Sequence, residues 1–148
     1  SYATGSVSGV HRTGGLVGEA WGSITNSYAT GEVSGRIFIG GLVGRADSST
    51  ITNSYATGEV IGTEDVGGLV GRIYNSSGYY CRVKYSYALD LGLPLIGSRD
   101  DSSSSRNIIT GSNLLSETEM KQRSSYSDNW DFDDIWQINE GVSYPTLR

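Results

Sequence analysis

The sequence predicts an all-β fold, a parallel β-solenoid of about four to five coils closed by a C-terminal cap that contains a short helix. Three observations support this fold. The ten residues ITNSYATGEV occur without a change at Ile24–Val33 and at Ile51–Val60. Two further motifs share one period of 26–27 residues. Each copy contains short β-type runs divided by Gly, Asn and Ser, without the apolar i, i+3, i+4, i+7 spacing of a helix.

The period is set by the motifs SYATG and GGLVG, which advance together. SYATG begins at Ser1, Ser27 and Ser54, and GGLVG begins at Gly14, Gly40 and Gly67. Both motifs therefore advance by 26 and then by 27 residues. Two or three strands of about five residues, with their corners, fill a unit of this length, and each coil would add about 4.8 Å to the stack.

Equivalent positions of successive coils should lie above one another and form the core. The expected apolar columns are Ile24, Ile51 and Val83; Leu16, Leu42 and Leu69; and Val7, Val33 and Val60. Like residues pair favourably in an in-register parallel ladder, and glycines at the corners permit close stacking. Exact repetition is therefore expected on physical grounds alone.

A fourth, eroded copy follows the three clear ones. VKYSYALD, which begins at Val83, aligns with ITNSYATG, and LPLIG (Leu93–Gly97) aligns with GGLVG. The insertion YNSSGYYCR (Tyr74–Arg82) lengthens the third copy. We expect the repeats to occupy residues 1–98, with the insertion near residues 74–82.

The remaining residues, 99–148, are expected to form a loop, a short helix and an aromatic cap. SETEMKQR predicts the helix, because Ser116 and Glu119 fit a capping box and Glu117 lies four residues before Lys121.

The aromatic segment Trp130–Leu147 is expected to form part of the cap, since an exposed last coil offers unpaired strand edges. No such cap precedes Ser1. We therefore expect further coils, or another molecule, to cover that edge.

Composition excludes several classes of protein. The 148 residues allow one domain with a core, and the net charge of −5 with no Lys/Arg cluster argues against a nucleic-acid-binding surface. No apolar run approaches the roughly 20 residues of a membrane span. The chain has neither a starting Met nor a signal peptide.

The repeats resemble a known family. GGLVG together with NSYATGxV resembles the GLUG-motif repeats of large bacterial and archaeal surface proteins, including adhesin-like proteins and the non-catalytic regions of IgA1-specific metallopeptidases. The ending SETEMK…WDFDDIWQINEGVSYPTLR is similar to the segment that commonly closes such arrays. The resemblance covers Ser1–Gly71, Val83–Gly97 and Glu117–Arg148. It implies an extracellular or cell-surface repeat module.

No catalytic constellation stands out. The metallopeptidase relatives depend on a His-Glu-x-x-His zinc site, whereas this chain has one histidine, His11, so a zinc hydrolase of that kind is excluded. We expect His11 to be an exposed loop residue. The single cysteine, Cys81, has no nearby His and is expected to be structural. The sequence thus predicts no enzyme, no cofactor and no metal ligand.

The acidic run DNWDFDD (Asp128–Asp134) offers oxygen ligands of the kind that Ca²⁺ prefers. It lacks the spacing of an EF-hand loop and its central Gly. The alternation of acids with Trp and Phe favours instead a strand with its aromatic face on the core.

Four tyrosines, Tyr2, Tyr28, Tyr55 and Tyr87, form the candidate partner or glycan surface. If this column faces solvent, its rings can stack on sugars or pack on a partner; if it faces inward, it fills a corner of the core. The sequence leaves both orientations open.

The favoured function is a non-enzymatic, extracellular adhesin-type structural module. Two alternatives remain: a self-assembling filament subunit whose first coil packs end to end on a copy of itself, and a carbohydrate-binding accessory module. The expected partners are accordingly a protein or glycan on another surface, or copies of the chain, with no nucleic acid.

Overall fold

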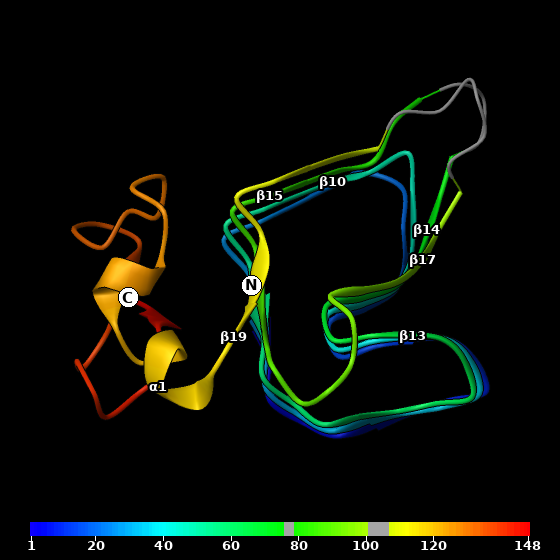
Figure 1. The fold of residues 1–148 in the computed structure, drawn as a ribbon, viewed down its shortest axis with the longest axis horizontal. Coiled ribbons are helices and arrows are strands. Elements are labelled where there is room, and N and C mark those ends of the chain that lie inside the picture. Colours follow the sequence, from blue (N-terminus) through cyan, green and yellow to red (C-terminus); the bar gives the residue numbers. More distant parts are fainter. Residues whose placement is uncertain (76–78, 101–106) are drawn as a thin grey trace.

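The computed structural model describes residues 1–75, 79–100 and 107–148, and most of them wind into a parallel β-solenoid (Figure 1). Each coil retraces the path of the one before it, and the predicted fold class is confirmed. Five parallel sheets run along the stack, each taking one strand from successive coils.

The strands of these five sheets fall into equivalent sets. In stacking order they are β1 (Tyr2–Ala3), β6 (Tyr28–Ala29), β11 (Tyr55–Ala56), β16 (Tyr87–Leu89) and β19 (Asn113–Leu115); β2 (Val7–Ser8), β7 (Val33–Ser34) and β12 (Val60–Ile61); β3 (His11–Gly14), β8 (Ile37–Gly40) and β13 (Glu64–Gly67); β4 (Val17–Ala20), β9 (Val43–Asp47), β14 (Val70–Tyr74) and β17 (Ile96–Arg99); and β5 (Ser23–Thr25), β10 (Thr50–Thr52), β15 (Arg82–Lys84) and β18 (Ile108–Thr110).

The register places the predicted apolar columns in line. Ile51 pairs with Ile24 below it and with Val83 above it. Val33 pairs in the same way with Val7 and Val60. In the leucine column each amide donates to the carbonyl one coil further on, and the ladder runs through Leu16, Leu42, Leu69 and Leu95. LPLIG is therefore the fourth copy of GGLVG.

A ladder of serines supports the SYATG strands. The hydroxyl of Ser54 accepts a hydrogen bond from the amide of Ser27 at 3.2 Å and donates to the carbonyl of Thr52 at 2.9 Å. Ser86 and Ser112 repeat the arrangement in the next two coils. Each hydroxyl thus joins two coils, which explains the invariant Ser of the motif.

GGLVG forms a sharp bend that reaches into the interior of the coil. A Cβ on Gly41 would collide with the carbonyl oxygen of Gly68 and would lie 2.9 Å from the Cβ of Ala56. Gly15 faces Ala29 across the same distance, and Gly68 faces Ala88. The bend of one coil therefore packs against the alanine of the following SYATG strand, at a separation that leaves no space for a side chain.

Ion pairs join the two strands that leave each bend. Arg12 pairs with Glu19 in the first coil, and Asp65 pairs with Arg72 in the third, each at 2.9 Å. The charges stand in opposite order in the two coils. In the second coil the equivalent of Arg12 is Phe38, and the Arg72 guanidinium lies 5.5 Å from the centre of its ring.

The coils continue beyond residue 98, where the sequence pattern loses its period. β18 and β19 pair in register with β15 and β16. NIITGSNLL keeps the apolar pattern and Ser112, but a glycine, Gly111 (φ 58°), stands at the left-handed corner position that Asn26 and Asn53 hold (φ 48°). The pattern is missed because these shared features are few and the segment 99–107 separates them from the earlier copies.

The fourth coil is shortened on one side. Eleven residues, Tyr87–Gly97, replace the 17 residues from Tyr55 to Gly71. Leu93 from this short connection packs on the small cluster of Val33, Ile39 and Val60. The connection thereby covers that side of the interior at the end of the stack.

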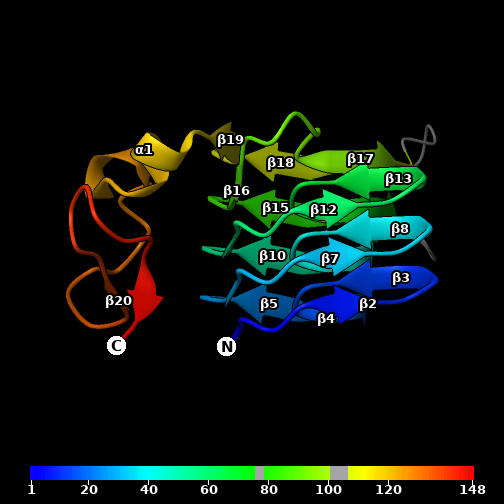
Figure 2. The same ribbon diagram turned by 90° about the horizontal axis from the view of Figure 1, so that it is seen from below.

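The last part of the chain, residues 116–148, is named here the flank segment. It contains α1 (Glu117–Met120), a 3₁₀ turn η1 (Arg123–Ser125) and an antiparallel pair, β20 (Trp136–Gln137) with β21 (Thr146–Leu147). The predicted capping box of Ser116 and Glu119 is present. The sequence predicts a cap over the last coil, but Figure 2 shows the segment beside the stack, along its height. Its aromatic residues match the exposed tyrosines on that side rather than the open strand edges.

The bend predicts a specific sensitivity. We expect Gly41→Ala to lower the free energy of unfolding by about 2–3 kcal/mol, because the added methyl group meets backbone and Ala56 in the neighbouring coil. Gly5→Ala is the matched control, since a Cβ there meets nothing within 4 Å. Urea unfolding of both variants tests this, and equal stabilities would contradict the packing role of the bend.

Candidate binding surface

The four candidate tyrosines lie on one outer side of the solenoid. Successive side chains of a strand point to opposite faces, so alanine points into the coil and tyrosine points away from it. The rings of Tyr2, Tyr28 and Tyr55 stack with their centres 5.1 Å apart and their planes within 9° of parallel. The column therefore faces outward, and each stacked ring covers the face of the next.

The flank segment buries most of this column. Tyr28, Tyr55 and Tyr87 keep 7%, 1% and 4% of their surface exposed, whereas Tyr2 keeps 61%. Trp136 lies about equally close to Tyr28 and Tyr55, with ring centres at 6.0 and 6.1 Å. The resulting aromatic cluster also includes Met120, Tyr126, Trp130 and Phe132.

Trp130 marks the point where the stack of tyrosines is interrupted. Its ring lies 6.2 Å from Tyr55 and 5.9 Å from Tyr87, so it contacts both coils. Its indole N–H donates to the carbonyl of Tyr85 at 2.8 Å. The flank segment is thereby anchored to the third and fourth coils through one side chain.

Hydrogen bonds fix the flank segment against the column at three further places. The Tyr55 hydroxyl donates to the carbonyl of Pro145, and the Tyr87 hydroxyl accepts from the amide of Ser127 at 3.1 Å. The side-chain amide of Asn53 donates to the carbonyl of Asn129 at 2.9 Å. The segment is thus held by polar contacts as well as by ring packing.

The predicted glycan surface on Tyr28, Tyr55 and Tyr87 is therefore not accessible in this structure. Sugars stack on ring faces, and here those faces are occupied by other rings of the same chain. Between Tyr28 and Tyr144 a groove of about 340 Å³ remains, and the column presents ring edges to it. Only Tyr2 keeps the large exposed surface that the hypothesis requires.

His11 and Cys81 lie far from any shared site. His11 is exposed at the start of β3, on a strand rather than in a loop. Cys81 is buried, its thiol lies 3.4 Å from both the amide of Ser49 and the carbonyl of Ala46, and burial raises the pKa of the thiol. Both observations agree with the structural interpretation of these residues.

The acidic run Asp128–Asp134 forms turns. Asp131 accepts hydrogen bonds from the amides of Asp133 and Asp134 at 2.9 and 2.8 Å, while Trp130 and Phe132 are buried. The prediction of aromatic residues inward and acids outward holds, but the predicted strand is wrong because Asp131 closes a turn instead. Within residues 1–75, 79–100 and 107–148 no group of three or more His, Cys, Asp or Glu side chains gathers in a metal-binding arrangement.

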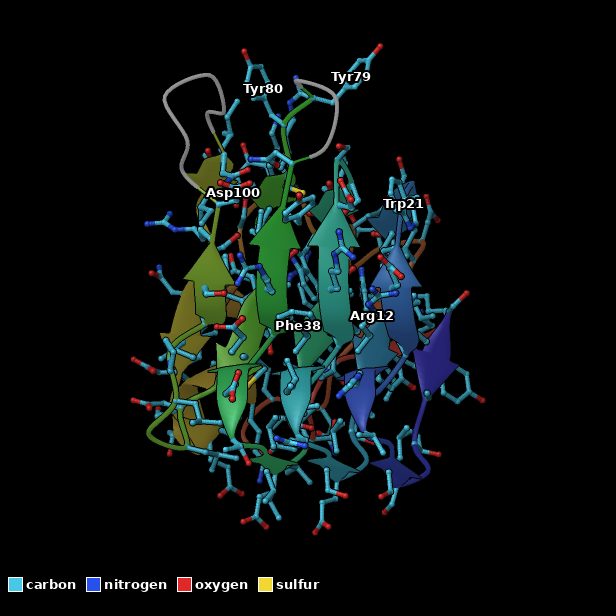
Figure 3. All side chains as sticks on the ribbon, turned by 90° about the vertical axis from the view of Figure 1, so that its right-hand side faces the viewer. Arg12, Trp21, Phe38, Tyr79, Tyr80 and Asp100 are labelled. Carbon is cyan, nitrogen blue, oxygen red and sulfur yellow. The ribbon has the colours of Figure 1, made fainter. Side chains whose placement is uncertain are left out.

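A second set of exposed aromatic side chains lies on the opposite side of the stack from the flank segment. Figure 3 shows Trp21, Tyr79 and Tyr80 on this face, together with Arg12, Phe38 and Asp100. Trp21 is 62% exposed and Tyr79 is 69% exposed. The sequence reveals these residues only as an insertion and a single unrepeated Trp, so no column pattern distinguishes them.

Comparison with known proteins agrees with this architecture. The family model described as the GLUG motif matches residues 9–34 and residues 39–61. The chain is a GLUG-motif repeat protein. No curated protein and no solved structure matches it.

Each GLUG match spans one contact between a bend and an alanine. Residues 9–34 include Gly15 and the Ala29 that it faces, and residues 39–61 include Gly41 and Ala56. The motif therefore corresponds to the two surfaces that pack against each other in the interior of adjacent coils. Within the part of the chain that the structure describes, no helix is long and apolar enough to cross a membrane.

The buried tyrosines of this GLUG protein predict sensitivity to alkali. Burial raises the pKa of Tyr55 and of Tyr126 above the ordinary value near 10. A raised folded-state pKa gives stability that is complete below the unfolded pKa and is lost as pH rises through the folded one. We expect the free energy of unfolding to be level around neutral pH and to fall above about pH 10.

Tyr55→Phe tests the contribution of one ring. The variant loses the hydrogen bond to Pro145, which costs about 1 kcal/mol near neutral pH, but its stability should fall less steeply above about pH 10. Tyr79→Phe, at an exposed side chain, is the control. Unfolding curves across the alkaline range measure the effect, and identical slopes for wild type and Tyr55→Phe would contradict it.

Proposed function

We propose that this GLUG solenoid is a non-enzymatic structural module of an extracellular or cell-surface protein, which presents its outer faces to a partner in the manner of an adhesin. One observation carries the proposal: five parallel sheets keep their register along a filled interior. Such a stack is a stiff rod whose side chains serve packing. The resemblance to repeats of surface proteins supports the location.

The use of the charged side chains supports a structural function. Arg12 and Glu19, and likewise Asp65 and Arg72, pair across the glycine bend. The buried Asp47 is paired with Arg45 at 3.2 Å. These groups hold strands together and do not converge on a common cavity.

Surface labelling of intact source cells tests the location. Antibodies against this chain should label cells without permeabilisation, and a protease added outside should remove the signal. Labelling that appears only after permeabilisation would overturn the proposed location while leaving the fold unaffected.

End-to-end association is a second candidate function, and the first coil favours it. Strands β1 to β5 each have a neighbour on one side only. Leu16, Val17 and Ile24 are partly buried, whereas their counterparts Leu42, Val43 and Ile51 in the second coil are fully buried. This end of the rod therefore offers strand edges and apolar surface together, a combination that promotes pairing with another chain.

Charges placed on this edge test the association. If the first coil joins copies, Tyr2→Lys and Thr25→Lys should shift the sedimenting species toward the monomer, because charged side chains on an edge strand oppose pairing. Both positions are exposed strand residues of the first coil. Val142→Lys, at a 65% exposed residue of the flank segment, is the control and should change nothing. A wild-type monomer whose melting is independent of concentration would contradict this function.

A further inference from the structure

One corner of the solenoid differs from the others in length. It is the corner at which strands of the β4 set turn into strands of the β5 set. In the first two coils two residues separate these strands, whereas β14 ends at Tyr74 and β15 begins at Arg82, and β17 ends at Arg99 and β18 begins at Ile108. Two successive coils are thus extended at the same corner, which lies away from the flank segment (Figure 1). Insertions of repeat proteins commonly lie on the face that binds a partner.

The base of this corner is tied together by amide side chains. Asn75 and Asn107 both donate to the carbonyl of Asp100, at 3.1 and 3.2 Å. Their side-chain oxygens both accept from the amide of Cys81 at 3.3 Å. The two extended coils therefore share one hydrogen-bonded base, which fixes the chain on either side of it.

Aromatic rings line this corner along the solenoid axis. Ala20 pairs with Ala46, and Asp47 with Tyr74, so Trp21 and Tyr74 occupy equivalent positions two coils apart. Two coil steps correspond to about 10 Å. Tyr79 and Tyr80 project beyond the same edge of the face as Trp21 (Figure 3). Trp21 and Tyr79 are exposed over more than half of their surfaces, so their ring faces are open to a ligand.

The charges beside the rings are already matched. The Arg45 guanidinium lies 4.5 Å from the centre of the Tyr74 ring and pairs with Glu19 at 3.0 Å and with Asp47 at 3.2 Å. This arginine fixes the tyrosine ring and has its charge compensated by two carboxylates. The rings thus stand in surroundings suited to an uncharged ligand.

Open aromatic faces in a row beside amide and carbonyl groups fit the chemistry of sugars. A pyranose ring places its C–H face on an aromatic ring, and its hydroxyls turn outward to amides and carbonyls. One unit of an extended oligosaccharide is about as long as one coil step. We propose that the corner formed by Trp21, Tyr74, Tyr79 and Tyr80 binds a neutral, extended oligosaccharide along the solenoid axis. This inference goes beyond the structural function and does not depend on end-to-end association.

Calorimetric titration with neutral oligosaccharides tests the proposal. The probes are linear gluco-, manno-, xylo- and N-acetylglucosamine oligomers of increasing length. For at least one series, affinity should rise with length up to about three units, the span from Trp21 to Tyr74, and then level off. Trp21→Ala and Tyr79→Ala should each weaken binding by about tenfold with unchanged melting, because both side chains are exposed.

Tyr2→Ala is the matched control, since Tyr2 is an equally exposed tyrosine on the other side of the rod. Its affinity should equal that of the wild type. Loss of binding in Tyr2→Ala but not in Trp21→Ala would place the sugar on the tyrosine column and overturn the proposal. Binding of acidic oligosaccharides alone, or of no oligosaccharide by the wild type, would overturn it as well.

Discussion

The contact between the glycine bend and the alanine of the next coil is the constraint on which the rest of the molecule depends. Gly41 and Ala56 approach so closely that neither position accepts a larger side chain. This approach divides the cross-section into two parts, each filled by its own apolar cluster. The bend also turns the chain back outward, where ion pairs such as Arg12–Glu19 join the two strands that leave it. A change in any one coil would have to be matched in its neighbours, which favours exact repetition of the sequence.

The same strands serve two packing surfaces at once. In each SYATG strand alanine contacts the bend inside the coil, while tyrosine contacts its equivalents and the flank segment outside. A large aromatic residue suits the outer position because stacked rings continue the coil spacing, and the hydroxyl can still reach a carbonyl such as that of Pro145. The motif is thus fixed from both sides, and none of its conserved letters is left over for a ligand.

Much of the fold could be predicted from the repeats, because identical residues at a fixed period require equivalent positions. The period predicted the columns of Ile24 and Leu42 and the parallel register. The path of the coil could not be predicted, since it depends on how closely the bend approaches Ala56, and sequence spacing carries no such distance. The position of the flank segment was missed because its aromatic residues fit an end cap and a side cover equally well. The corner of Trp21 and Tyr79 was missed because it joins an unrepeated residue to an insertion.

The flank segment alters how the rod should lose its structure. In a plain solenoid each coil contacts only its neighbours, so the ends can fray while the middle stays intact. Here one segment contacts Tyr28, Tyr55 and Tyr87, side chains from three successive coils, and is covalently joined to the last strand, β19. Opening any of these coils also exposes part of the aromatic cluster, which couples layers that do not touch each other. The chain should therefore unfold in one cooperative transition rather than coil by coil.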